Sequence, residues 1–105
     1  MTESARELQG KAKEFAGKLR RHLPSLTERY QVKTLGLFGS YVRGEEKDGS
    51  DVDVLVEFVE KPDLLEFVAL QRELSEHLGV KVDLVMKDAL KPGIGACILE
   101  EVVGV

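Results

Sequence analysis

The sequence has one cysteine, three prolines and no long apolar run, and each shortage excludes a class of protein. A single cysteine, Cys97, cannot form an intrachain disulfide, which excludes a disulfide-stapled domain. Its neighbours Ala96 and Ile98 predict a small core residue, with a reactive thiol as the alternative. With 43% hydrophobic and 32% charged residues, the chain is neither disordered nor collagen-like, and one globular domain over residues 1–105 is expected.

Membranes and nucleic acid are not expected as the main partners. The chain has no run of about 18 apolar residues, so no transmembrane helix is predicted. Residues 2–23 are charged throughout and lack a signal-peptide core, which favours a cytoplasmic protein. The formal net charge of -4 argues against nucleic acid as the main partner, because nucleic-acid-binding domains usually carry a basic surplus.

Hydrophobic periodicity predicts an α/β or α+β domain with a small sheet. Residues 3–23 have the spacing of a helix that Pro24 would end, with a basic cluster in the last turn that either suits the helix dipole or contacts a partner. The helix stripe is Leu8, Ala12, Phe15 and Leu19, and the basic cluster is Lys18, Arg20, Arg21 and His22. The later elements are a strand at 32–38, a helical turn at 41–43, a strand at 52–59, a helix opened by the capping box Asp63–Glu66 and stopped at Gly79, a strand at 80–86 and a closing helix at 94–103.

Two aspartates interrupt the apolar pattern of the strand at 52–59. Asp51 and Asp53 alternate with valines, so they share one face with Cα atoms roughly 6.5 to 7 Å apart. Two carboxylates that close repel each other, and a hard cation such as magnesium would relieve the repulsion. Two such ions can support phosphoryl chemistry. The alternative is the solvent face of an edge strand.

Gly39 and Ser40 stand at the end of the strand at 32–38, and ten residues separate Ser40 from Asp51. A glycine there lets backbone N–H groups approach an anion, and the serine adds a hydroxyl donor. A helical turn after them would add positive potential at its N-terminus. An ordinary turn is the alternative.

Two familiar ligand loops are excluded. The spacing of Gly39 and Gly44 matches a P-loop, but two glutamates follow where lysine and serine or threonine are required. The letters DGSDVD suggest a calcium loop, but Asp53 and Val59 occupy the positions of its required glycine and glutamate.

The stretch GLFGSYVRGEEKDGSDVDVLVEF resembles the signature of the DNA polymerase beta-like nucleotidyltransferase superfamily. That signature is an apolar strand, Gly-Ser, about ten residues, Asp-x-Asp and a later acidic residue on another strand. The chain length and the closing ALKPGIGACILEEVV resemble the minimal nucleotidyltransferase (MNT) subfamily. The resemblance covers nearly all of the chain from Val32 onward and implies a small mixed sheet flanked by helices. One departure is the tail EVVGV, because relatives often carry an aromatic residue near the end.

The resemblance also implies the site. Asp51 and Asp53 would bind magnesium, as two ions, and Asp83 would complete the metal site and help to activate the acceptor hydroxyl. Gly39 and Ser40 would hold the nucleoside triphosphate.

Three further side chains have more than one interpretation. Arg43 either steadies a phosphate or is a solvated arginine. Glu57 is a rival third ligand, but the rise along the strand places it roughly 13 Å from Asp53 and farther from Asp51, which favours Asp83. Tyr41 is predicted to pack beside the turn, with a catalytic role as the alternative. The two histidines, His22 and His77, show no ligand spacing and are assigned to the surface.

The implied reaction transfers a nucleotide from a triphosphate such as ATP to an acceptor hydroxyl. MNT proteins are commonly paired with a HEPN-type toxin ribonuclease, as its antitoxin, and can transfer AMP to a tyrosine of that partner. An active, magnesium-dependent adenylyltransferase is therefore expected. The alternatives are an idle binding module that covers the toxin's active site, and transfer onto a small molecule or an RNA end.

Overall fold

The computed structural model describes residues 10–47 and 49–105. In chain order the elements are α1 (Gly10–Tyr30), β1 (Val32–Phe38), α2 (Ser40–Arg43), β2 (Val52–Phe58), α3 (Leu64–Leu78), β3 (Val82–Met86), the 3-10 turn η1 (Lys87–Ala89), α4 (Ile94–Glu101) and β4 (Val103–Gly104). The strands form one sheet in the order β3-β2-β1-β4, with β2 and β3 parallel and the other neighbours antiparallel. The expected small mixed sheet flanked by helices is confirmed.

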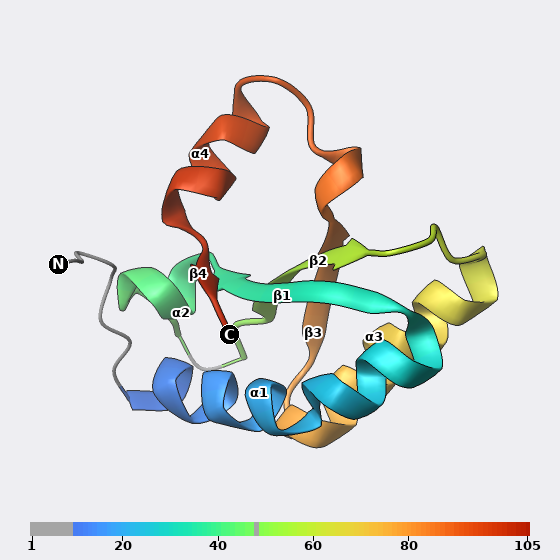
Figure 1. The fold of residues 1–105 in the computed structure, drawn as a ribbon. Helices are drawn as coiled ribbons and strands as arrows, with labels where there is room; N and C mark the ends of the chain where they lie inside the picture. The colour runs from blue at the N-terminus through green and yellow to red at the C-terminus, as the bar shows by residue number, and fades with distance from the viewer. Residues whose placement is uncertain (1–9, 48) are drawn as a thin grey trace, which may run out of the picture.

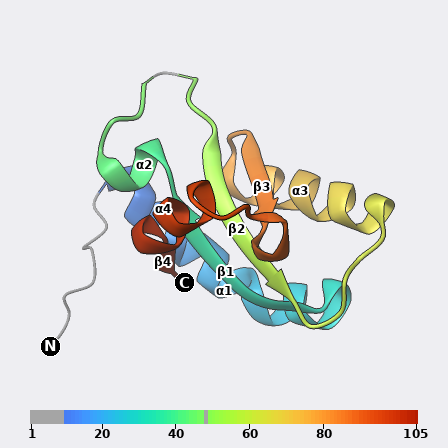
Figure 2. The same cartoon turned by 90° about the horizontal axis from the view of Figure 1, so that it is seen from above.

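The helices lie on opposite faces of the sheet. Helices α1 and α3 cover one face, whereas η1 and α4 lie over the other (Figures 1 and 2). The core forms where α1 and α3 meet the sheet, because Phe15, Leu19, Leu70 and Leu74 pack there against buried strand residues. None of the helices in the described residues is both long and apolar enough to cross a membrane.

The alternation of β2 decides what each face of the sheet presents. Val52, Val54 and Val56 are fully buried in the core cluster. Because successive side chains on a strand point to opposite faces, Asp53 points to the face that carries α4. The burial of three valines therefore fixes the direction of the acidic side chain.

Helix α3 begins and ends as its sequence predicts. The side chain of Asp63 accepts a hydrogen bond from the Glu66 backbone N–H, and the Glu66 side chain accepts one from the Asp63 N–H. Gly79 closes the helix in the left-handed conformation with φ 74°. The capping box and the glycine stop are confirmed.

The prediction that Pro24 ends the first helix is wrong, because α1 continues through Pro24 to Tyr30. Proline inside a helix removes one backbone hydrogen bond. Contacts after it offset that loss: Leu26 is fully buried, and Arg29 and Tyr30 both donate hydrogen bonds to Glu73 of α3. The basic cluster Lys18, Arg20, Arg21 and His22 consequently lies in the middle of α1 and not in its last turn. The predicted start at residue 3 and the stripe residue Leu8 lie outside the described residues.

A polar cluster joins α1 to α3. Arg29 donates to both carboxylate oxygens of Glu73, and these hydrogen bonds hold the pKa of Glu73 down at about 2. His77 contacts the same carboxylate at 3.2 Å, and its ring stacks on that of His22 with 3.7 Å between ring centroids. The two histidines, expected on the surface, are thus half-buried between the helices.

The C-terminal segment differs from its prediction in two respects. The closing helix ends at Glu101 rather than at residue 103, and the residues after it form β4 beside β1. Gly36 makes this pairing possible, because a Cβ there would come 2.5 Å from Val102 Cγ2. Cys97 is exposed, so its assignment to the core is wrong. Only Gly95 of α4 is buried, so the apolar letters around Cys97 do not mark a core helix.

Candidate active site

The residues singled out in the sequence meet where the end of β1 faces the start of β2. In the strand register, Phe38 pairs with Asp53 across β1 and β2, and Asp53 pairs with Asp83 across β2 and β3. Paired residues on neighbouring strands point to the same face, and such strands lie roughly 4.8 Å apart. The sheet therefore places Gly39, Asp53 and Asp83 side by side.

Asp51, Asp53 and Asp83 form an acidic cluster whose carboxylates repel one another. Burial, followed by the neighbouring carboxylates of Asp83 and Asp51, raises the pKa of Asp53 to about 6. The positive charge of Arg43 opposes the shift without cancelling it. Near neutral pH the chain thus holds a half-buried negative charge beside two further carboxylates, an arrangement that a bound cation stabilises.

Gly39 leaves room for the Asp53 carboxylate. Its φ of 84° and ψ of -158° lie in a region that is essentially restricted to glycine. A Cβ on this residue would overlap Asp53 Oδ2 and lie 2.8 Å from Asp53 Cγ. The glycine is therefore required both by the turn of the chain and by the close approach of the carboxylate.

A cleft opens next to this turn, between the end of β1 and α4. It is open to solvent on one side and is lined by Phe38, Gly39, Arg43, Asp53, Ile94, Cys97, Ile98 and Glu101. The four lining residues from α4 recur at helical spacing, so one face of that helix forms a wall of the cleft.

Two groups that can bind an anion point into the cleft region, and Glu101 engages both. The Gly39 backbone N–H donates to Glu101 Oε2 at 2.7 Å, and Arg43 Nη1 donates to Glu101 Oε1 at 2.7 Å. Arg43 also donates to Glu45 at 2.8 Å, and these hydrogen bonds raise its pKa. Helix α2 is a single turn of four residues, so the dipole expected from it adds little beside these two donors.

The donor set fits a hard divalent cation that is bound together with its substrate. Among the described residues, no three ligand-type side chains converge as in a pre-formed metal cluster. Magnesium is usually held by one or two carboxylates plus substrate phosphates, and so does not require such a cage. Asp53, with Asp51 and Asp83 beside it, offers the oxygen ligands that this mode of binding needs.

The other predicted residues fall into two groups. Ser40 begins α2 directly after Gly39, and Asp51 directly precedes β2. Each is therefore next in the chain to an element that borders the acidic cluster. Glu57 is occupied elsewhere: it accepts from Thr34 at 3.2 Å, and Lys33 Nζ and Lys87 Nζ lie 3.8 and 3.9 Å from its carboxylate. The geometry thus favours Asp83 over Glu57 as the third acidic group.

Tyr41 packs as predicted, and Glu101 was missed. The Tyr41 ring meets Phe15 edge to face at 5.3 Å between centroids, and its hydroxyl donates to the Ser50 carbonyl at 3.3 Å. Glu101 lies 62 positions from Gly39 in the sequence. The sequence around Glu101 predicts a solvent-facing helix residue, and no local pattern indicates that it belongs to the site.

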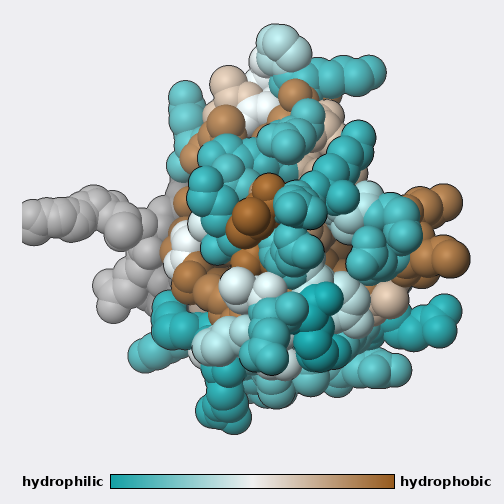
Figure 3. All heavy atoms as spheres, turned by 45° about the vertical axis from the view of Figure 1, so that its right-hand side comes forward, coloured by the Kyte–Doolittle hydropathy of each residue, from teal (hydrophilic) through white to brown (hydrophobic). Residues whose placement is uncertain are grey.

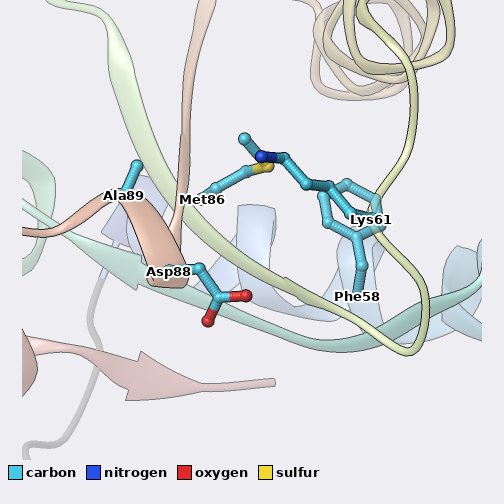
Figure 4. Close-up of a pocket in the computed structure, with 5 residues that line it drawn as sticks. All are labelled: Phe58, Lys61, Met86, Asp88 and Ala89. Atoms are coloured by element: carbon cyan, nitrogen blue, oxygen red, sulfur yellow. The ribbon is translucent and has the colours of Figure 1, made fainter.

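A second hollow lies at the other end of the parallel strands β2 and β3. It lies between the end of β2 and the segment from Met86 to Ala89 (Figure 4). Its lining residues are Phe58, Lys61, Met86, Asp88 and Ala89. None of these belongs to the acidic cluster, so the cleft beside Gly39 remains the candidate active site.

The raised pKa of Asp53 leads to a prediction for the metal-free chain. The pKa of about 6 lies above the ordinary 3.8, so the folded state holds the proton more tightly than the unfolded state. The stability that this group contributes is lost as the pH rises from about 4 to 6. With a chelator present, Asp53→Asn is expected to be more stable than the native chain by about 1 kcal/mol near pH 7.5, and the gain should vanish near pH 4.

Chemical denaturation at several pH values measures this difference. Glu60→Gln is the control, because Glu60 is an exposed carboxylate in the turn after β2. A loss of stability in Asp53→Asn near pH 7.5 would show that the carboxylate has a structural role in the native state.

Comparison with known proteins agrees with the geometry. Residues 19–103 match the nucleotidyltransferase domain family. Protein adenylyltransferase MntA of Thermococcus cleftensis is 55% identical over 82 residues, which is 78% of this chain and 83% of that protein. A solved structure provisionally assigned as a minimal nucleotidyltransferase is 32% identical, with a TM-score of 0.74 over 92% of this chain and 97% of the other.

A more distant structure shares the fold. It is the tri-AMPylated HEPN toxin of Shewanella oneidensis in complex with its MNT antitoxin, which matches with a TM-score of 0.57 and 20% identity over 90% of this chain and 67% of the other. At that identity the likeness concerns the fold alone. The family matches and the fold together confirm the resemblance carried by the Gly-Ser and Asp-x-Asp motifs, and the chain belongs to the nucleotidyltransferase domain family as a minimal nucleotidyltransferase.

Proposed function

We propose that this nucleotidyltransferase is a magnesium-dependent protein adenylyltransferase of the cytoplasm, a single domain that transfers AMP from ATP to a tyrosine hydroxyl of a HEPN-type toxin and releases pyrophosphate. The observation that carries the proposal is the meeting of Asp53 with Asp83 and Asp51 beside a glycine turn that lines an open cleft. The relative from Thermococcus cleftensis, named a protein adenylyltransferase, supports AMP as the transferred group and a protein as the acceptor.

Each side chain has a part in this proposal. Asp51 and Asp53 hold the magnesium, and Asp83 completes the site and orients the attacking tyrosine hydroxyl. The Gly39 N–H, Ser40 and Arg43 bind the triphosphate and direct its α-phosphate toward the carboxylates. Bound magnesium supplies positive charge that offsets the negative charge developing on the phosphate during transfer.

Exposed apolar side chains support a protein partner. Leu64 and Leu65 at the start of α3 are 76% and 81% exposed, and Val59 before them is 65% exposed. On the face shown in Figure 3, apolar groups project among mostly hydrophilic ones. Leu64 and Leu65 are consecutive in the chain, and adjacent exposed apolar side chains are typical of surfaces that bind another protein.

The experiment that tests the proposal combines the chain with a HEPN-type ribonuclease from the same genome, ATP and magnesium. Mass spectrometry of the ribonuclease should show AMP attached to a tyrosine, and its nuclease activity should fall as the adduct accumulates. Neutralisation of the nuclease without an adduct, retained when Asp51 and Asp53 are both replaced by asparagine, would contradict the proposal and support the alternative of a module that covers the toxin's active site.

A further inference from the structure

Glu101 engages two donors of the cleft that could otherwise bind an anion. Its two carboxylate oxygens accept from the Gly39 backbone N–H and from Arg43 Nη1, each at 2.7 Å. These two donors are the anion-binding groups that line the cleft. A carboxylate and a phosphate compete for such donors, because both offer charged oxygen acceptors to N–H groups.

We propose that Glu101 closes the phosphate position of the nucleotide-free protein, and that an incoming triphosphate must displace its carboxylate from Gly39 and Arg43. The inference rests on the proposed nucleotide site and adds a device that regulates access to it. Glu101 also lines the cleft together with Asp53. Its negative charge therefore opposes a triphosphate in addition to occupying that ligand's donors.

The attachment of α4 allows this displacement. Gly95 is the only buried residue within Ile94–Glu101, so the helix is held by little core packing. Ile94, Cys97 and Ile98 lie on the same face as Glu101 and line the cleft. A small outward movement of α4, or a rotation of the Glu101 side chain alone, frees both donors without disturbing the core under α1 and α3.

Closure by Glu101 reduces the apparent affinity for nucleotide. A ligand that binds only the open form has its affinity lowered by the fraction of molecules that are open. Glu101→Gln keeps the shape of the side chain but removes the charge that strengthens both hydrogen bonds. The open form is then more populated, and nucleotide should bind more tightly.

Isothermal titration with the non-hydrolysable analogue AMP-PNP and magnesium tests the inference. The dissociation constant of Glu101→Gln is expected to be about five- to tenfold lower than that of the native chain. Glu101→Ala, a second variant in case the first misfolds, should change it in the same direction. Glu100→Gln is the matched control, because it removes one charge from an exposed neighbour on the same helix, and its affinity should stay within about twofold of the native value.

The outcomes separate this inference from the proposed function. Magnesium-dependent binding that is equal or weaker in both Glu101 variants, with native thermal melts, would overturn the closure by Glu101 and leave the nucleotide site standing. Equal gains in Glu100→Gln and Glu101→Gln would overturn it too, because net charge alone would explain the change. Failure of the native chain and of every Glu101 variant to bind AMP-PNP would overturn the nucleotide site and the inference together.

Discussion

Replacement of both Asp51 and Asp53 by asparagine is expected to lower the rate of AMP transfer at least about 10³-fold. The two side chains lie at the start of β2 beside Asp83, and burial and like charge have raised the pKa of Asp53 to about 6. Asparagine keeps the size of each side chain but removes the charge that would hold magnesium. Without that ion, the negative charge that builds up on the transferred phosphate has no strong counter-charge.

The measurement is the initial rate of incorporation of labelled AMP into the HEPN-type partner at saturating ATP and magnesium. Glu60→Gln, which removes an exposed carboxylate outside the cleft, should keep the native rate. Thermal melts of the metal-free double variant should show an intact fold, because the substitutions relieve repulsion. A double variant that keeps more than about a tenth of the native rate would contradict the assignment of these residues to the metal site.

Gly39→Ala is expected to damage both the fold and the site. Its φ of 84° and ψ of -158° cost an alanine about 2 kcal/mol or more, and the added Cβ would overlap the Asp53 carboxylate. Either the turn or Asp53 must move, so AMP-PNP binding should weaken by at least about tenfold. Denaturation curves and calorimetric titration measure the two effects.

Gly79→Ala is the matched control for Gly39→Ala. Gly79 also has a positive φ, of 74°, but a Cβ there meets nothing within 4 Å, and it caps α3 away from the cleft. This variant should lose about 1 kcal/mol and keep native affinity for AMP-PNP. Equal stability losses in the two variants, with unchanged affinity in both, would show that the contact between Gly39 and Asp53 has no role in the site.

The centre of the site was predictable because its signals are local. Alternation of Asp53 with buried valines places the aspartate on the face away from the core, and the short turn Gly39-Ser40 brings the end of β1 next to it. The third carboxylate followed from the family resemblance, and the in-register pairing of Asp53 with Asp83 brings it alongside. The first two placements depend on strand geometry that a short sequence window contains, whereas the placement of Asp83 does not.

The incorrect predictions depend on contacts between segments that are distant in the sequence. Pro24 is a helix terminator by local rules, yet Leu26 and the pairing of Arg29 with Glu73 continue the helix past it. Cys97 is surrounded by apolar letters, but α4 lies over the open face of the sheet, where these side chains line a cleft. A two-residue strand such as β4 shows no periodicity. The one local signal is Gly36, because a glycine inside a strand such as β1 can indicate the close approach of another backbone segment.

Glu101 shows the same limit at the site itself. Local sequence describes an acidic residue near the end of a short helix, and nothing nearby in the chain indicates Gly39 or Arg43 as its partners. Only the pairing of β4 with β1 brings the end of α4 back to the turn after β1. The regulation proposed for the cleft is therefore a property of the folded chain.

The central claim is that Asp51 and Asp53 form a magnesium-dependent nucleotide site. Calorimetric titration of ATP into the native chain and into Asp51→Asn/Asp53→Asn, each with and without magnesium, tests it most directly. The account predicts binding by the native chain that requires magnesium and is absent from the double variant. Equal binding of ATP by both chains, or binding by the native chain that ignores magnesium, would contradict it.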